Sequence, residues 1–162
     1  MFFLIGFIIF QDLRPLQYVD PLNRMPTSYE NYATLQTEMP FTYQVMSTRV
    51  GERQDLIVIM VNDSLYPKII GALDQYAADL AAEGYATLLI KTLGGTPADI
   101  RNLLIAQVPN DLIGAVLIGD LPVAWWEASA YGEDYPVDLF FSDLNGSWAD
   151  ANGNGIYDQH GG

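Results

Sequence analysis

The sequence predicts an α/β fold in which a three-layer parallel sheet is followed by an irregular, acidic C-terminal segment. The prediction depends on three mainly apolar segments at residues 56–61, 85–91 and 113–119. None of these segments alternates polar with apolar residues, which is typical of strands that helices cover on both faces. Helical patterns separate them, so the expected order is β-α-β-α-β with right-handed crossovers.

The segment at residues 113–119 is expected to be a central strand, because its residues are apolar and its larger side chains are branched. Pro122 forbids further pairing beyond it, since proline has no N–H. Asp120 therefore lies just past the carboxyl end of a buried strand, where α/β folds place ligand sites, although it is equally suited to cap a turn. One hypothesis is a metabolite site formed by four residues at two strand ends: Asn62, Asp63, Gly119 and Asp120.

Two helices are expected between these strands. The first spans about residues 67–83, and Gly84 ends it, because glycine readily adopts the left-handed conformation of a helix C-terminus. The second begins at Thr96, whose side chain is suited to cap it, and Pro97 fits its first turn. Each carries apolar residues on one face: Ile69, Leu73, Tyr76 and Leu80 in the first, and Ile100, Leu103, Leu104 and Val108 in the second.

Charge limits the partners of this chain. Its formal net charge is −13, from 7 Lys and Arg against 20 Asp and Glu, so it repels phosphate backbones and nucleic acid is not expected as a partner. Arg101 is the last basic residue, and nine acids follow it. A bound cation would relieve the repulsion among them, whereas a solvated acidic surface is the plainer alternative.

The residue types also exclude several kinds of chemistry. The chain contains no cysteine, which excludes disulfides, cysteine-ligated zinc and a cysteine nucleophile within it. Its single histidine is His160, and no Gly-x-Ser-x-Gly motif accompanies it, so a serine triad is not expected. No catalytic residue is therefore assigned.

Three regions are expected along the chain. Residues 1–10 are almost wholly apolar but too short to span a bilayer, and they are interpreted as a signal-peptide remnant, with a hydrophobic first strand as the alternative. Residues 11–54 contain four prolines and are expected to form an extended lead-in with one short strand near residues 41–47. Residues 55–162 form the α/β domain, whose aromatic residues beyond Pro122 are expected to build a small satellite core rather than a sugar-binding surface.

Residues 150–158 carry the clearest sign of a ligand. Oxygen-bearing side chains fall at positions 1, 3 and 5 of this loop, glycine follows at position 6, and position 7 offers a backbone carbonyl. This alternation is typical of a calcium loop, although such turns also form without metal. Position 12 is Gly161, where an EF-hand has a bidentate glutamate. We therefore predict a weak Ca²⁺ site that needs upstream help, with these ligands: Asp143, Asn145, Asp150, Asn152, Asn154, Ile156 and Asp158.

Four segments carry a resemblance to a known family through their order and spacing. They are residues 61–66 (VNDSLY), 94–97 (GGTP), 114–125 (GAVLIGDLPVAW) and 138–148 (DLFFSDLNGSW). Together with the loop that follows, they resemble the amino-terminal part of gingipain-type cysteine peptidases, which belong to the caspase-like clan. The resemblance covers about residues 56–160, and it implies a caspase-like, flavodoxin-like sheet, bound calcium and a secreted or cell-surface location.

The same resemblance bears on activity. The family uses a histidine in a Gly-His-Gly context and a later cysteine, whose thiolate attacks the peptide carbonyl. Gln159 precedes His160 and cysteine is absent, so no catalytic role is carried over. We predict a non-catalytic N-terminal fragment of a secreted peptidase that stops before the catalytic half and has no stable membrane span. Its partners would be the remainder of the peptidase chain or a peptide substrate, and the alternative is a calcium-dependent structural or adhesion module of a secreted protein.

Overall fold

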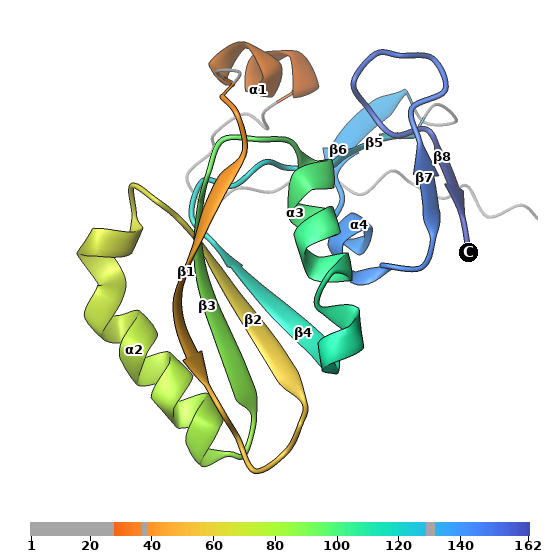
Figure 1. Ribbon diagram of the computed structural model, residues 1–162. Helices are drawn as coiled ribbons and strands as arrows, with labels where there is room; N and C mark the ends of the chain where they lie inside the picture. The colour runs from red at the N-terminus through yellow and green to blue at the C-terminus, as the bar shows by residue number, and fades with distance from the viewer. Residues whose placement is uncertain (1–27, 37–38, 129–131) are drawn as a thin grey trace, which may run out of the picture.

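The main feature of the fold is a mixed four-stranded sheet with the strand order β1-β3-β2-β4 (Figure 1). The computed structural model describes residues 28–36, 39–128 and 132–162. The strands are β1 (Thr42–Arg49), β2 (Leu56–Asn62), β3 (Ala86–Leu93) and β4 (Leu112–Ile118). The molecule is therefore mixed α/β, as the sequence predicts.

The three apolar segments form the parallel part of this sheet. β2 pairs in parallel with β3 on one side and with β4 on the other. The prediction that these three strands lie side by side in one direction is therefore confirmed. The expectation of a wholly parallel sheet is wrong, because β1 pairs antiparallel with β3. β1 lacks the mainly apolar sequence of the other three strands, because it is an edge strand whose first four side chains are exposed.

The expectation that residues 113–119 form a central strand is also wrong. Among the described residues, β4 is an edge strand that pairs only with β2. Exposed and half-buried side chains alternate along it, and Ile113 is 57% exposed. An apolar run reports what lies above and below a strand but not whether a neighbour pairs with its backbone edge. The pattern alone therefore could not distinguish a central strand from an uncovered edge.

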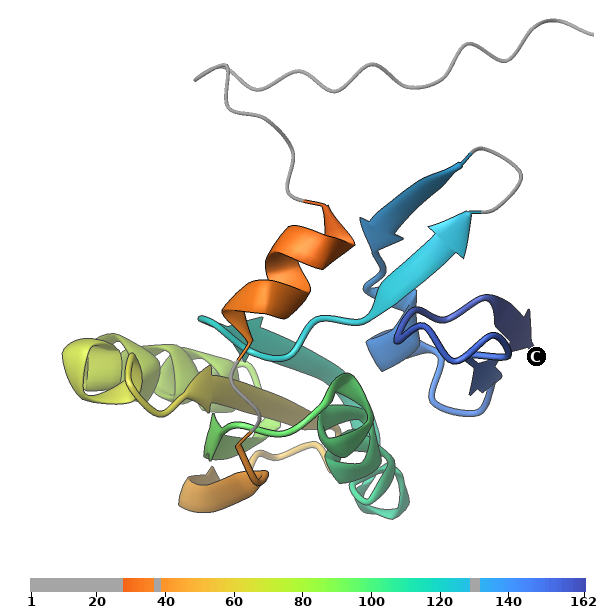
Figure 2. The same ribbon diagram turned by 90° about the horizontal axis from the view of Figure 1, so that it is seen from above.

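The two main helices contribute to two separate core clusters. α2 (Tyr66–Ala82) packs Leu73 and Ala77 against Ile59 of β2. α3 (Pro97–Ile105) packs Ile100 and Leu104 against the alternate residues of the same strand, among them Val58 and Met60. Successive side chains of a strand point to opposite faces, and Figure 2 shows α2 on one side of the sheet and α3 on the other. β2 is consequently the best-buried element of the fold.

Both predicted helices are found with small shifts at their ends. Thr96 caps α3 and forms a reciprocal capping box with Asp99, in which the Thr96 backbone N–H donates to the Asp99 carboxylate at 2.8 Å. Such a box satisfies two N–H groups that a helix start otherwise leaves unpaired. α3 ends at Ile105, and a short 3-10 helix, η1 (Val108–Asn110), leads into β4. The expectation that Val108 belongs to the buried face of this helix is therefore wrong, because Val108 lies beyond α3 and is 50% exposed.

The region before residue 55 contains more structure than an extended lead-in. α1 (Tyr29–Leu35) packs the rings of Tyr29 and Tyr32 against Trp125, at centroid distances of 5.7 and 5.6 Å. The Tyr32 hydroxyl also accepts a hydrogen bond of 2.9 Å from the Val123 backbone N–H. β1 belongs to the main sheet, and it matches the short strand expected near residues 41–47. The interpretation of residues 1–10 as a signal remnant lies outside the described residues.

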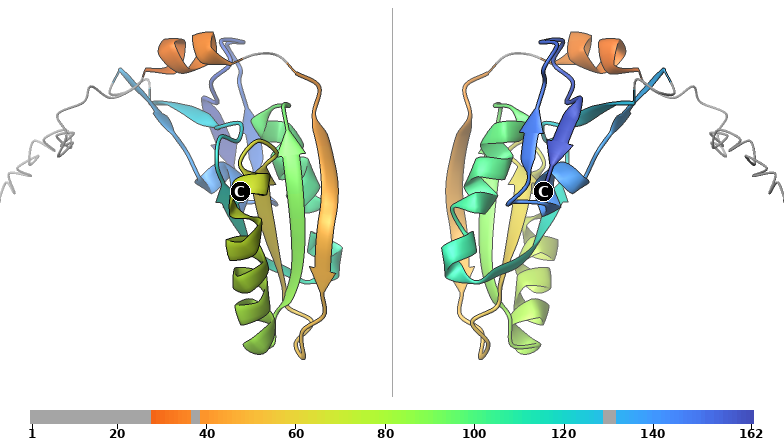
Figure 3. Two further views of the ribbon diagram at one scale, coloured as in Figure 1. Left: turned by 90° about the vertical axis from the view of Figure 1, so that its left-hand side faces the viewer. Right: turned by 90° about the vertical axis from the view of Figure 1, so that its right-hand side faces the viewer.

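Beyond β4 the chain folds into a C-terminal lobe of two hairpins and one short helix. The hairpins are β5–β6 and β7–β8, with α4 between them. The bounds are β5 (Trp125–Ala128), β6 (Glu133–Pro136), α4 (Leu139–Ser142), β7 (Ser147–Ala149) and β8 (Gln159–Gly161). In Figure 3 the loop between β7 and β8 lies at the same end of the sheet as α1. Sequence patterns missed these elements because each is only three or four residues long.

Aromatic side chains form the core of this C-terminal lobe. Phe140 is 2% exposed and stacks on Tyr157 at a centroid distance of 4.5 Å. Trp148 meets both rings edge-on. The expected satellite core is therefore present, although Tyr135 stays exposed and Tyr131 lies outside the described residues. Within the described residues, no helix combines the length and the apolar character needed to cross a membrane.

Candidate metal centre

The loop at residues 150–158 is organised around the carboxylate of Asp150. Its Oδ1 atom accepts backbone N–H groups from Gly153 at 2.7 Å and Asn154 at 3.2 Å, and its Oδ2 atom accepts that of Gly155 at 2.8 Å. Gly153 and Gly155 both have positive φ, at 73° and 89°, which glycine adopts without strain. The backbone of the loop thus folds around the carboxylate of its first residue.

Asn152 and Asn154 face a carboxylate from outside the loop. Their Nδ2 atoms donate to the same oxygen, Oε2 of Glu127, at 2.8 and 2.9 Å. Their Oδ1 atoms accept backbone N–H groups two residues further on, from Asn154 and Ile156. Each amide therefore has its oxygen turned into the loop and its nitrogen turned to Glu127.

Backbone hydrogen bonds hold Glu127 against the loop. The Tyr157 N–H donates to the Trp125 carbonyl, and the Glu127 N–H donates to the Tyr157 carbonyl, both at 2.9 Å. These bonds extend β5 with a parallel bridge between Trp126 and Tyr157. The side chain of Ile156 is 4% exposed, and its burial anchors the loop to the lobe. The backbone of Glu127 is consequently held beside the loop by strand-like hydrogen bonds, and its side chain contacts the two asparagines.

The remaining predicted ligands divide into two groups. Asp158 lies at the loop, where its Oδ1 atom accepts the Ala151 N–H at 2.9 Å. Asp143 and Asn145 lie at the other end of the β7–β8 hairpin, in the turn between α4 and β7. There the Asp143 carboxylate is 2.6 Å from Nε2 of His160. The structure therefore gathers Asp150, Asn152, Asn154, Ile156 and Asp158, and it places Asp143 and Asn145 apart from them.

The candidate donors at and beside this loop are all oxygen atoms. Glu127, Asp150 and Asp158 carry carboxylates, Asn152 and Asn154 carry amide oxygens, and Ile156 has a backbone carbonyl. Ca²⁺ takes six to eight such ligands and tolerates irregular geometry. Within the described ranges, no three His, Cys, Asp or Glu side chains are grouped closely enough to hold a metal. A cation at this loop would therefore depend on the amide and carbonyl oxygens as well as on carboxylates.

Glu127 is the residue that sequence analysis missed. It precedes the loop by more than twenty residues, and the hairpin that carries it has no motif of its own. The only signal is the missing acid at position 12, because a calcium loop without that glutamate needs a carboxylate from elsewhere. Glu127 supplies a carboxylate beside positions 3 and 5 of the loop.

Burial affects one titratable group beside the loop. Desolvation raises the pKa of the Tyr157 hydroxyl, the Arg101 charge acts against this shift, and the Asp150 carboxylate adds to it. Tyr157 therefore stays neutral over the physiological pH range, which suits its stacked position in the aromatic core.

Gly155→Ala is expected to destabilise the loop and its contact with α1. A Cβ at this position would collide with the Tyr29 hydroxyl, and the φ of 89° is unfavourable for alanine. We expect a loss of about 1–3 kcal/mol in the free energy of unfolding, measured by urea titration. Gly132→Ala is the matched control, since Gly132 also has positive φ, and no atom of the described residues lies within 4 Å of a Cβ placed there. Equal losses in the two variants would contradict the close approach of Tyr29.

The residues proposed for a metabolite site at the strand ends make two polar contacts. The Asn62 amide donates to the Asp120 carbonyl at 2.7 Å, which joins the carboxyl ends of β2 and β4. The Asp63 carboxylate is paired with Lys91 at 2.8 Å. These groups satisfy one another, and they identify no ligand.

His160 has no catalytic arrangement around it in the described residues. Its ring lies against Trp148 at a centroid distance of 4.2 Å, and its Nε2 atom is engaged with Asp143. The Ser147 hydroxyl on the neighbouring strand donates to the Gly161 carbonyl instead.

Comparison of the chain with family models, curated proteins and solved structures gives no match.

Proposed function

We propose that this chain is the non-catalytic N-terminal part of a secreted, gingipain-like cysteine endopeptidase, and that its β7–β8 loop binds Ca²⁺. The observation that carries the calcium part is the position of Glu127, which brings a carboxylate from β5 to the asparagines of a loop already wrapped around Asp150. The peptidase part is supported by the four sequence segments. In chain order they fall on the β2–α2 junction, the β3–α3 loop, β4 with the connection to β5, and the α4–β7 region.

The proposed role of the chain is structural. Peptide hydrolysis by this family needs a thiolate, and the chain contains no cysteine. We therefore expect no peptidase activity from it alone. The parallel strands would form part of the sheet in a three-layer, caspase-like fold. The catalytic residues would come from the remainder of the peptidase.

Calcium would stabilise the lobe by reducing repulsion among its acids. The chain has no Lys or Arg after Arg101, so the carboxylates of Glu127, Asp150 and Asp158 lack basic neighbours in sequence. A divalent cation bound between β5 and the β7–β8 loop would join two segments that are distant in sequence. Because it would bind the folded state and not the unfolded chain, it would add to the free energy of unfolding.

Glu127→Gln is expected to weaken Ca²⁺ binding at least about tenfold, because it removes one of the charged ligands that set the affinity of such loops. Isothermal titration calorimetry of the full chain with CaCl₂ measures this directly. Glu133→Gln is the matched control, since Glu133 is exposed on the partner strand β6 and pairs with Ala128. Loss of binding in both variants, or in neither, would contradict the assignment of Glu127.

The sequence that follows Gly162 in the gene tests the peptidase part separately. A downstream Gly-His-Gly segment and a later cysteine would support it. Repeat modules in that position would contradict it and would favour the calcium-dependent adhesion module instead.

A further inference from the structure

The outer edge of β4 is suited to pairing with another strand. β4 pairs with β2 along one edge only, so along the other edge alternate N–H and C=O groups have no strand partner within the described residues. Natural edge strands are commonly protected by lysine, proline or a bulge that turns the edge away. β4 contains neither residue, and its sequence is Leu-Ile-Gly-Ala-Val-Leu-Ile. Its one register shift falls at Ile113, between the Leu112–Leu56 and Gly114–Ile57 pairs, so the strand from Gly114 to Ile118 pairs regularly with β2.

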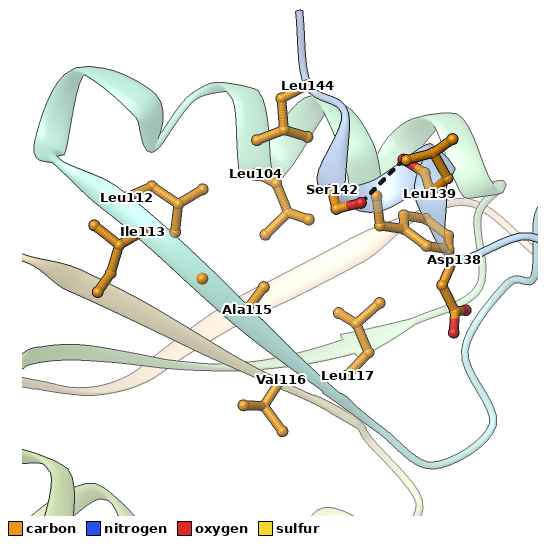
Figure 4. A pocket seen from close by; sticks show the side chains of 12 residues that line it. Leu104, Leu112, Ile113, Ala115, Val116, Leu117, Asp138, Leu139, Ser142 and Leu144 are labelled. Atoms are coloured by element: carbon orange, nitrogen blue, oxygen red, sulfur yellow. Dashed lines mark hydrogen bonds between the residues drawn. The ribbon is translucent and has the colours of Figure 1, made fainter. Parts of the chain in front are cut away.

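An apolar groove runs along this edge on the side of α3 and α4. It has a volume of about 740 Å³, and its walls come from β4, Leu104 of α3 and the α4 segment. Figure 4 shows Ala115 and Leu117 of β4 on one side of the groove and Leu139 and Ser142 on the other. Ile113 is 57% exposed and Leu139 is 50% exposed. A strand added beside β4 would insert alternate side chains into this groove, because successive side chains of a strand point to opposite faces.

The charge around the edge indicates the chemistry of the partner. Exposed carboxylates lie at both ends of β4, in Asp111 and Asp120, and Asp138 lines the groove itself. Of the residues that the structure describes, no Lys or Arg lines the groove. An apolar strand with basic residues at its ends would therefore match both the groove and its rim.

We propose that the β4 edge binds an extended, apolar segment of a partner polypeptide with Lys or Arg at its ends, which adds a fifth strand to the sheet. Backbone hydrogen bonds would provide the affinity, and the groove would select alternate apolar side chains. The proposal depends on the sheet and its charges, and it holds whether or not the partner is the catalytic part of a peptidase.

A second copy of the chain fits this edge poorly. Two β4 edges related by a twofold axis would pair antiparallel, which places Asp111 of one copy near Asp120 of the other. Like charges in opposed positions destabilise strand pairs. Each copy also carries a formal net charge of −13, so self-association is additionally disfavoured.

Fluorescence anisotropy of the full chain with a labelled peptide tests the proposal. The probe is a nine-residue peptide of alternating valine and threonine with arginine at both ends, and the control peptide has glutamate in place of arginine. We expect saturable binding of the arginine peptide and binding at least about tenfold weaker for the glutamate peptide. Amide hydrogen exchange followed by mass spectrometry should show new protection in β4 when the arginine peptide is added.

Ile113→Lys is the variant that locates the site. A lysine on this exposed edge is expected to weaken binding of the arginine peptide about tenfold or more, because it introduces like charge and blocks strand addition. Ile70→Lys is the matched control, since Ile70 is 42% exposed but belongs to α2, and we expect binding within about twofold of wild type. Circular dichroism of both variants confirms that they fold, and Leu139→Lys provides a second groove variant with the same expectation as Ile113→Lys.

Four results would overturn the proposal. These are absence of saturable binding, equal binding by the two peptides, equal affinity in the Ile113→Lys and Ile70→Lys variants, and β4 amides that are already protected in the chain alone. The last result would show that a second copy or another part of the same chain covers the edge, and sedimentation velocity distinguishes these two cases.

Discussion

Asp150→Ala is expected to abolish the rise in melting temperature that millimolar Ca²⁺ gives the chain. Asp150 is position 1 of the loop, and its carboxylate also organises the backbone by accepting the N–H groups of Gly153, Asn154 and Gly155. Alanine removes both the ligand and the acceptor. The variant should therefore be less stable without Ca²⁺ and insensitive to its addition.

The size of the effect follows from binding linkage. Calcium sites of extracellular modules have dissociation constants of about 10⁻⁴ to 10⁻³ M, so 10 mM Ca²⁺ is about ten to one hundred times that constant. This concentration stabilises the folded state by about 1.4–2.7 kcal/mol. For a domain of this length each kcal/mol corresponds to roughly 2–4 °C. We expect a rise of roughly 3–10 °C for the wild-type chain, measured by differential scanning calorimetry, and none for Asp150→Ala.

Asp134→Ala is the control for a general charge effect. Asp134 is exposed on β6 and opposes Glu127 across the β5–β6 hairpin without reaching the loop through any hydrogen bond of the described residues. This variant should keep the full response to Ca²⁺. A rise that persists in Asp150→Ala, or an unchanged wild-type melting curve at 10 mM Ca²⁺, would contradict Ca²⁺ binding at this loop.

Arg101→Met is expected to separate the C-terminal lobe from α3 and to destabilise the chain by about 3–5 kcal/mol. The Arg101 side chain donates three hydrogen bonds to backbone carbonyls: to Phe140 at 3.0 Å, to Asp143 at 2.8 Å and to Gly146 at 2.7 Å. Its guanidinium also lies over the Phe140 ring, 5.3 Å from the centroid. Methionine keeps the apolar stem but leaves these partly buried carbonyls unpaired, which costs more than the bonds contribute.

Urea unfolding followed by tryptophan fluorescence measures this loss, because Trp148 lies in the lobe and packs on Phe140. Arg53→Met is the matched control, since Arg53 is exposed and only approaches the Tyr85 ring and hydroxyl. A surface cation–π contact of this kind contributes about 0.5–1 kcal/mol. Similar losses in the two variants would show that Arg101 does not hold the lobe in place.

The parallel strands were predictable from sequence because the burial of a strand's faces determines the composition of its own segment. β2 is buried on both faces, so its composition is apolar throughout, and helical spacing marks α2 and α3 around it. The neighbours of each strand are set by long-range pairing that leaves no local pattern. This is why β4 was expected at the centre of the sheet and β1, with its exposed and polar side chains, was seen only as a short isolated strand.

The loop ligands were predictable from local spacing, whereas the upstream carboxylate of Glu127 depends on a long-range contact. Asp150, Asn152 and Asn154 follow a fixed local spacing, so the sequence alone identifies them as candidate ligands. Asp143 is near the loop in sequence, which is why it is a predicted ligand. The β7–β8 hairpin carries the loop away from it, and Asp143 contacts His160 instead. Glu127 reaches the loop through the bridge between Trp126 and Tyr157, which no spacing rule contains.

A crystal structure of the full chain grown with CaCl₂, with anomalous scattering recorded at long wavelength, tests the calcium loop most directly. We predict one calcium peak with oxygen atoms of Asp150, Asn154 and Glu127 at about 2.3–2.6 Å. A peak at Asp143 instead, or a loop without calcium in which Glu127 still accepts both asparagine amides, would contradict this prediction.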